Sequence, residues 1–156
     1  MGNSEKNKAV FFDRDGTINI EKNYLFRIAD FEFQPGIIEV IKRYRDEGYL
    51  IIIITNQSGI ARGFYSLSDY TKLSEWMCEQ FKLKGIEITK VYHCPHHPEI
   101  TGPCRCRKPK PGMILDAIKD YNIDPGKSIL IGDKKSDIFA GRNAGIGKNF
   151  YIQDIL

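Results

Sequence analysis

Two apolar stretches of this 156-residue sequence end in acidic residues that are arranged for metal or phosphoryl chemistry. FFDRDGTIN places Asp13 and Asp15 two residues apart, which directs both carboxylates to the same side of an extended chain. ILIGDKKSD places Asp133 after a second apolar run. One such aspartate is usually a turn former or a helix cap. Three of them favour a shared Mg²⁺ ion, because neighbouring carboxylates repel one another unless a cation or a proton intervenes.

Polar and basic residues in two other stretches could hold a phosphate group. ITNQSGIARG supplies Thr55, Asn56 and Ser58, whose hydroxyl and amide groups can donate hydrogen bonds to an anion. CRKPKPG supplies Arg107, which can grip a phosphate with two parallel bonds, and Lys108, a compact positive charge. Beside the three acids, these residues predict a site for a phosphorylated ligand.

The stretch HCPHHPEITGPCRCRKPKPG, residues 93–112, holds all three histidines and three of the four cysteines of the chain. Cys94, Cys104 and Cys106 with one histidine would form a closed tetrahedral set that is typical of structural zinc. A disulfide is the alternative, but the absence of an apolar signal segment at the N-terminus favours a reducing compartment, the cytoplasm. Four protein ligands leave no place for water, so such a zinc ion would stiffen the backbone next to the two basic residues.

These candidate residues need a sheet that gathers the ends of several strands at one edge. Strands are expected over residues 8–13, 49–54, 87–94, 127–133 and 147–152, and helices over residues 35–48, 66–85, 110–122 and 135–145. This alternation is typical of an α/β fold with a Rossmann-like, mostly parallel sheet and helices on both faces. Ligands bind at the carboxyl ends of the strands in such sheets, where the acids and the polar residues fall.

The overall composition excludes several classes of protein. The chain is 42% hydrophobic and 28% charged with a net charge of +3, as in an ordinary globular domain. No apolar run approaches the roughly 18 residues that a bilayer crossing needs. We expect a single domain over residues 1–156, a monomer, and no membrane or nucleic-acid partner.

In this order the motifs resemble those of the haloacid dehalogenase-type phosphatases, with DRDGT as the first motif, ITN the second, Lys108 the third and GDKKSD the fourth. The resemblance extends from residue 9 to residue 152 and implies the fold of that family. It implies an Mg²⁺-dependent mechanism in which Asp13 forms an aspartyl-phosphate and Asp15 acts as general acid and base. Thr55 and Lys108 would steady the transferring group. Asp13, Asp133 and Asp15, the last through its backbone oxygen, would bind the Mg²⁺ ion.

The cysteine-rich stretch narrows the resemblance to a subgroup that includes histidinol-phosphate phosphatases and D-glycero-D-manno-heptose 1,7-bisphosphate phosphatases. The Cys-x-His spacing of that subgroup selects His96, rather than His93 or His97, as the partner of Cys94, Cys104 and Cys106. The zinc-bound loop would then span residues 94–106, inserted in the phosphatase domain. The chain has no room for a large cap domain, so the site should be open.

ITNQSGIARG, LSEWM and the cysteine-rich stretch are most similar to the heptose enzymes. The resemblance implies removal of the 7-phosphate of a heptose 1,7-bisphosphate, within heptose and lipopolysaccharide biosynthesis. The substrate would be a small phosphorylated sugar. Its implied contacts are Asp13, Arg14, Asp15, Glu21, Lys22, Asn23, Tyr24, Thr55, Asn56, Gln57, Ser58, Arg107, Lys108 and Lys134.

Three other functions are compatible with parts of the sequence. A histidinol-phosphate phosphatase is the nearest, although QSGIARG and Arg107 suit a second phosphate better than a cationic amino alcohol. A polynucleotide 3′-phosphatase shares the motifs but would need a longer basic groove with aromatic residues. A zinc-stabilised binding module without turnover would leave the acids, Thr55 and Lys108 as unrelated loop residues.

Overall fold

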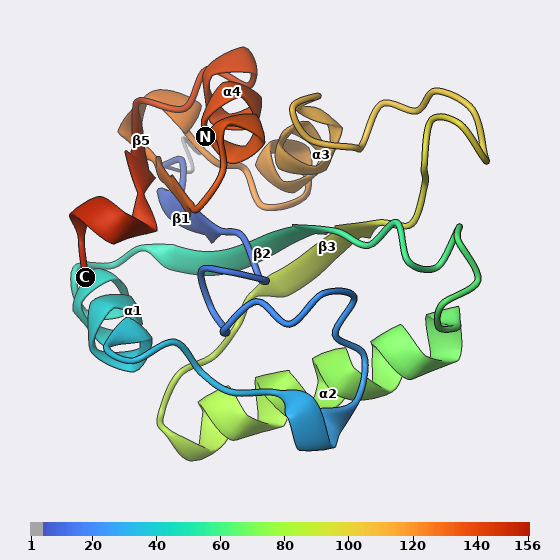
Figure 1. Ribbon diagram of the computed structural model, residues 1–156. Helices are drawn as coiled ribbons and strands as arrows, with labels where there is room; N and C mark the ends of the chain where they lie inside the picture. Colours follow the sequence, from blue (N-terminus) through green and yellow to red (C-terminus); the bar gives the residue numbers. More distant parts are fainter. Residues whose placement is uncertain (1–4) are drawn as a thin grey trace.

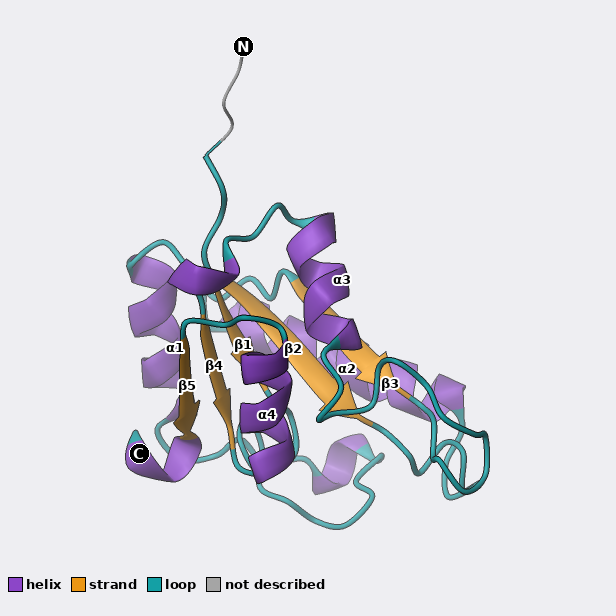
Figure 2. Cartoon of the chain, turned by 90° about the horizontal axis from the view of Figure 1, so that it is seen from above, coloured by secondary structure: helices purple, strands orange, loops and turns teal. Residues whose placement is uncertain are grey.

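The centre of the protein is a parallel sheet, seen here in a computed structural model that describes residues 5–156. The first four residues of the predicted domain lie outside the described part. The strands are β1 (Ala9–Phe12), β2 (Leu50–Asn56), β3 (Lys90–Cys94), β4 (Ile129–Gly132) and β5 (Lys148–Tyr151). They lie in the order β3-β2-β1-β4-β5, and every neighbouring pair is parallel (Figure 2). The predicted Rossmann-like sheet is confirmed.

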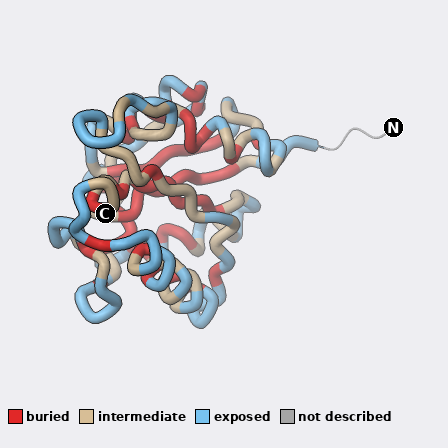
Figure 3. Tube along the Cα trace, turned by 90° about the vertical axis from the view of Figure 1, so that its right-hand side faces the viewer, coloured by how far each residue is buried: buried red, intermediate tan, exposed pale blue. Residues whose placement is uncertain are grey.

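Two helices cover each face of this sheet (Figure 1). The helices α1 (Ile37–Asp46) and α2 (Leu67–Leu83) lie on one face, and α3 (Gly112–Asp120) and α4 (Lys135–Asn143) lie on the other. Since both faces are covered, β1 and β2 are apolar on both sides rather than alternating. Figure 3 shows the resulting buried strands inside a shell of exposed helix faces and loops.

The buried side chains form two layers, one on each face of the sheet. On β1, Val10 and Phe12 belong to the layer with α1 and α2, whereas Ala9 and Phe11 belong to the layer with α3 and α4. Burial of each large apolar side chain contributes about 1.5–3 kcal/mol. The two layers fix the strands, and with them the positions at which the strands end.

The strand β2 extends two residues beyond the predicted apolar run and includes Thr55 and Asn56. The reason is backbone pairing, because the register with β3 continues through Asn56 opposite Cys94. Hydrophobicity does not reveal this pairing, since the last two side chains are polar. The extension places two predicted phosphate-binding residues on a rigid strand. Among the described residues, no helix combines the length and the apolar character of a membrane span.

Helix α2 provides a test of this layered packing. Leu73 is 0% exposed and packs in the core, whereas Leu83 on the same helix is 73% exposed. We expect Leu73→Ala to lower the free energy of unfolding by about 2–5 kcal/mol through lost burial and the cavity that remains. The matched change Leu83→Ala should lower it by less than about 0.5 kcal/mol. Urea denaturation followed by circular dichroism measures both, and equal losses would contradict the assignment of the core.

Candidate active site

The carboxyl ends of the three central strands border a cavity of about 380 Å³. Asp13 follows β1, Asn56 ends β2, and Asp133 follows β4. Parallel neighbours end at the same edge, which is why residues far apart in the sequence meet here. The cavity is lined by 11 of the 14 predicted substrate contacts: Asp13, Asp15, Glu21, Asn23, Tyr24, Asn56, Gln57, Ser58, Arg107, Lys108 and Lys134.

The remaining three predicted contacts do not line the cavity. Arg14 is buried behind Asp15 and is 1% exposed. Lys22 pairs on the surface with Glu32, with Nζ to Oε1 at 2.6 Å. Thr55 is buried, and its Oγ1 accepts a hydrogen bond from Gln57 Nε2 at 2.8 Å.

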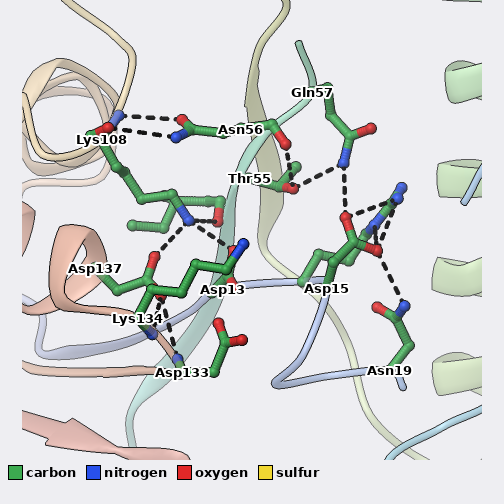
Figure 4. A network of polar contacts seen from close by, with 12 residues as sticks. Asp13, Asp15, Asn19, Thr55, Asn56, Gln57, Lys108, Asp133, Lys134 and Asp137 are labelled. Carbon is green, nitrogen blue, oxygen red and sulfur yellow. Dashed lines mark hydrogen bonds and ion pairs between the residues drawn. The ribbon is translucent and has the colours of Figure 1, made fainter. Parts of the chain in front are cut away.

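Lys108 is the centre of the polar network in Figure 4. Its Nζ donates to Asp13 Oδ1 and Asp137 Oδ1, each at 2.6 Å, and to the carbonyl oxygen of Ile54 at 3.2 Å. The three donors of the ammonium group therefore have three acceptors. Burial acts to lower the pKa of Lys108, but the attraction of the two aspartates outweighs it and raises this pKa. The side chain is thus a permanent positive charge inside the protein.

The contact with Lys108 does not fully offset the effect of burial on the Asp13 carboxyl group. Burial raises its pKa well above the ordinary value; the attraction of Lys108 opposes the rise, and the repulsion of Asp137 adds to it. Because Lys108 is shared between two carboxylates, one ammonium group does not balance both. A further cation at this place would favour the ionised form of Asp13.

The carboxylates fit a divalent cation. Single oxygens of Asp13, Asp133 and Asp137 all lie within 4.8 Å of one another. Asp133 Oδ1 is buried and has no hydrogen-bond partner among the described residues. Such hard oxygen ligands suit Mg²⁺. Two of these acids were predicted as ligands; Asp137 was not, and the side chain of Asp15 lies outside this group with partners of its own.

Asp137 shapes the acidic group as well as belonging to it. Its Oδ1 accepts from Lys108, while its Oδ2 accepts from the backbone N–H groups of Asp133 and Lys134, at 3.2 and 3.1 Å. One carboxylate therefore fixes both the lysine and the turn that carries Asp133. The GDKKSD motif contained the signal for this residue, one helical turn after Asp133.

Asn56 ties the strand β2 to the segment that carries Lys108. Its Oδ1 accepts from the backbone N–H of Lys108 at 3.1 Å, and its Nδ2 donates to the backbone oxygen at 3.4 Å. The side chain lines the cavity, but both of its polar ends hold protein backbone. Asn56 therefore positions the lysine.

The predicted cysteine and histidine ligands come together at the end of β3. Cys94 Sγ lies 3.5 Å from His96 Nδ1 and 3.7 Å from Cys104 Sγ, and His96 Nδ1 lies 3.3 Å from Cys106 Sγ. All four ligand atoms lie within 4.8 Å of one another. The sulfur separation is far beyond the roughly 2.05 Å of a disulfide, and the thiols are free.

The surroundings of Cys104 suit a metal-bound thiolate, whereas burial raises the pKa of Cys94 and of Cys106. Burial acts to raise the pKa of Cys104, but hydrogen bonds from the backbone N–H groups of Arg107 and Cys106 lower it to about 6. The thiolate is the form that binds metal. The two other histidines lie elsewhere: His97 Nε2 is 2.8 Å from Arg62 Nη2, and the His93 ring packs 4.4 Å from that of Tyr70.

Besides Asp137, three residues that line the cavity were not predicted as contacts: Gly59, Tyr65 and Ser136. Tyr65 is buried, and its hydroxyl donates to Gln57 Oε1. It reaches the site because residues 57–65 fold back on themselves, with Phe64 N bonded to the carbonyl oxygen of Gly59 at 2.9 Å. The local sequence around Tyr65 does not predict that this loop folds back toward the cavity.

Comparisons with known proteins give one consistent family. The polynucleotide kinase 3 phosphatase family matches residues 8–155. The chain is 52% identical over 153 residues to the D-glycero-alpha-D-manno-heptose-1,7-bisphosphate 7-phosphatase of Photorhabdus laumondii, which covers 95% of this chain and 84% of that protein. It is 48% identical over 150 residues to the D-glycero-beta-D-manno-heptose-1,7-bisphosphate 7-phosphatase of Pasteurella multocida, which covers 94% of this chain and 82% of that protein.

A solved structure agrees with these sequence relatives. The D,D-heptose 1,7-bisphosphate phosphatase of B. bronchiseptica, crystallised with magnesium and phosphate, superposes with a TM-score of 0.82 at 29% identity. The match covers 90% of this chain and 78% of that chain. The predicted resemblance to haloacid dehalogenase-like phosphatases is confirmed.

The raised pKa of Asp13 predicts that Mg²⁺ binding depends on pH. A carboxyl group that keeps its proton at a higher pH must release that proton when the cation binds. Below the raised pKa we therefore expect the Mg²⁺ affinity to fall about tenfold per pH unit. Isothermal titration calorimetry in buffers of different ionisation enthalpy counts the protons released. Binding without proton release at pH values below the raised pKa would contradict the prediction. Asp13→Asn is the control variant, because its side chain has no carboxyl proton to release.

Gly16 provides a second test, because the turn after Asp15 leaves no room for a side chain. Its φ is +90°, and an added Cβ would lie 2.1 Å from Asp133 Oδ2. We expect Gly16→Ala to displace Asp133 and to weaken Mg²⁺ binding about tenfold or more, in addition to a strain of about 1–3 kcal/mol. Gly145 is the matched control, because its φ is +81° and nothing lies within 4 Å of an added Cβ. Gly145→Ala should lower stability and leave Mg²⁺ affinity unchanged, as titration calorimetry can measure; unchanged affinity in Gly16→Ala would refute the crowding argument.

Proposed function

This chain belongs to the haloacid dehalogenase-like phosphatases, within the polynucleotide kinase 3 phosphatase family, and on that basis we propose that it removes the 7-phosphate of D-glycero-D-manno-heptose 1,7-bisphosphate. The observation that carries the proposal is the buried contact of Asp13 with Lys108, at 2.6 Å, beside a polar cavity open to solvent. Relatives named for this reaction match most of the chain, with 52% and 48% of the aligned residues identical.

In the proposed reaction, Asp13 attacks phosphorus and the bond to the sugar oxygen breaks, which leaves an aspartyl-phosphate. Lys108 offsets the negative charge that would otherwise repel the nucleophile from its substrate. Thr55 was predicted to steady the transferring group, but it is buried and does not line the cavity, so we assign it no contact with that group. Asp13, Asp133 and the backbone oxygen of Asp15 would hold Mg²⁺, which supplies positive charge to the phosphoryl oxygens when it is bound.

Asp15 serves both halves of this reaction. It gives a proton to the departing sugar oxygen in the first half and takes one from the attacking water in the second, so it returns to its starting form. Its position in the cavity wall, two residues after Asp13, supports this role. The proposed nucleophile, Asp13, is paired with Lys108 and not with Asp15, so the two aspartates have separate partners.

The rim of the cavity supports a bisphosphate substrate. Arg107 and Lys134 add two positive charges beyond Lys108, and Ser58 adds a hydroxyl group. We assign the phosphate that is not cleaved to Arg107, whose fork suits two parallel bonds to oxygen. The carboxylate of Glu21, also in the lining, would accept hydrogen bonds from sugar hydroxyls.

We further propose that Cys94, His96, Cys104 and Cys106 hold a structural zinc ion in a loop over residues 94–106 of a single 156-residue domain. The support is the close approach of the four ligand atoms and the thiolate-favouring surroundings of Cys104. Because free thiols persist under reducing conditions, we place the protein in the cytoplasm. We also take it to act as a monomer.

One other class of substrate has specific support, and the anomer of the proposed substrate is open. The matching family is described as a polynucleotide 3 phosphatase, which favours a 3′-phosphorylated oligonucleotide as a second candidate. The α and β anomers of the heptose substrate are both represented among the relatives, at 52% and 48% identity. Histidinol phosphate, the nearest alternative from the sequence, is less compatible with a rim that bears Arg107 and Lys134.

A phosphate-release assay decides between these substrates. Both anomers of heptose 1,7-bisphosphate, histidinol phosphate and a 3′-phosphorylated oligonucleotide are compared with Mg²⁺ present. We expect the highest kcat/KM for a heptose bisphosphate, and Asp13→Asn should reduce it by about 10⁴-fold or more through loss of the nucleophile. Circular dichroism checks that the variant is folded. A preference for the oligonucleotide or for histidinol phosphate would overturn the assigned substrate, and substantial activity in Asp13→Asn would overturn the nucleophile.

A further inference from the structure

The carboxylate of Asp15 is held from three sides, and none of its holders is part of the acidic group (Figure 4). Arg14 donates from Nε to Oδ1 at 3.2 Å and from Nη2 to both oxygens at 3.1 Å. Asn19 Nδ2 donates to Oδ1 at 3.0 Å, and Gln57 Nε2 donates to Oδ2 at 3.2 Å. Both oxygens are thus engaged by side chains whose positions the fold fixes.

Arg14 is placed to hold Asp15 and does not reach the substrate cavity. It is 1% exposed, its Nη2 also donates to the carbonyl oxygen of Leu25 at 3.1 Å, and its guanidinium carbon lies 6.0 Å from the centre of the Tyr70 ring. Its Nη1 is buried and unpaired among the described residues. Burying an arginine in this way is costly without a compensating role. The carboxylate that it grips is the proton-transfer group of the proposed reaction.

Gln57 reaches Asp15 from the other side and links it to Thr55. Its Nε2 donates to Asp15 Oδ2 and to Thr55 Oγ1, at 3.2 and 2.8 Å. The Tyr65 hydroxyl donates to Gln57 Oε1, which fixes the orientation of the amide and turns Nε2 toward the two acceptors. Tyr65 is itself held by stacking on Phe26, with ring centres 5.4 Å apart. Burial raises the pKa of Tyr65 to about 12, so the hydroxyl keeps the proton that it donates.

We propose that Arg14 and Gln57, the latter fixed by Tyr65, are positioning residues that hold the carboxyl group of Asp15 for its two proton transfers. This inference rests on the proposed phosphatase mechanism and reassigns two predicted substrate contacts. Proton transfer depends on the distance and direction between donor and acceptor, and a well-placed acid or base contributes about 10²–10⁴-fold. Loss of the positioning residues should remove part of that factor while substrate binding is retained.

The two half-reactions depend differently on Asp15, which gives the proposal a specific signature. A sugar oxygen needs a proton as its bond to phosphorus breaks. The p-nitrophenolate ion is a weak base and leaves without one. Hydrolysis of the aspartyl-phosphate needs the base whichever ester formed it. A displaced Asp15 should therefore slow sugar release and intermediate hydrolysis, and spare p-nitrophenolate release.

The experiment is rapid-mixing kinetics with Mg²⁺ on the whole chain, with p-nitrophenyl phosphate and heptose 1,7-bisphosphate as substrates. For Arg14→Met we expect a burst of p-nitrophenolate at a rate within about threefold of wild type, followed by turnover slowed by about 10- to 100-fold. With the sugar ester, the first step itself should be slowed by a similar factor, without a burst. The dissociation constant of the substrate, taken from the concentration dependence of the first step, should change less than about threefold, because Arg14 does not line the cavity. The steady-state KM for p-nitrophenyl phosphate should fall, because the second step is slowed and the first is not.

Matched variants separate positioning from general disruption. Arg14→Lys keeps the charge and loses the fork, so it should recover part of the lost rate. Tyr65→Phe keeps the stacked ring and releases the Gln57 amide, so it should give the same pattern at about 3- to 10-fold, even where Arg14→Met does not fold. Arg45→Met, at a surface arginine paired with Asp46, should match wild type.

Equal slowing of p-nitrophenolate release and sugar release in Arg14→Met and Tyr65→Phe would overturn the proposal, as would unchanged rates with both substrates. These outcomes differ from failure of the proposed function. If the heptose ester is not a substrate, wild-type enzyme fails with it, while the p-nitrophenyl phosphate burst in the variants still tests the role of Arg14 and Tyr65.

Discussion

A buried ammonium group between carboxylates is the constraint on which the rest of this structure depends. Lys108 Nζ lies 2.6 Å from both Asp13 and Asp137, and all three side chains are almost completely buried. Charges removed from water in this way persist only when they are paired with good geometry, and loss of one partner leaves the others uncompensated. The fold must therefore deliver a strand end, a helix start and a loop to one point with little freedom.

The parallel sheet meets this demand through its layers. The ends of β1 and β4 carry Asp13 and Asp133, and the adjacent start of α4 carries Asp137. Lys108 comes from a loop, which is intrinsically less fixed than a strand. That loop is tied at two places, by the side chain of Asn56 on β2 and by the cysteine and histidine group that immediately precedes it. A rigid sheet and a fastened loop together set the distance between nucleophile and lysine.

At the end of β2, two consecutive residues have different partners. Asn56 turns to the backbone of Lys108, whereas Gln57 turns to Thr55 and Asp15. The two sides of the proposed reaction, Asp13 with its lysine and Asp15 with its arginine, are thus anchored to the same strand end. A displacement of this strand end would affect both proton transfer and attack on phosphorus, because each depends on the position of its reacting groups.

The sequence by itself determined the alternation of strands and helices, the acids Asp13 and Asp133 at strand ends, and the grouping of cysteine with histidine, because apolar periodicity and local spacing are properties of the chain. Tertiary structure alone decided which partners the polar residues near the strand ends have. Asn56 was predicted as a phosphate contact, and Arg14 and Gln57 as substrate contacts, yet all three bond to other protein groups. Tyr65 enters the cavity through a loop that folds back. Sequence spacing specifies which residues lie near a strand end, but the direction of each side chain depends on partners far away in the sequence, such as Lys108, which is 52 residues from Asn56 and 95 residues from Asp13.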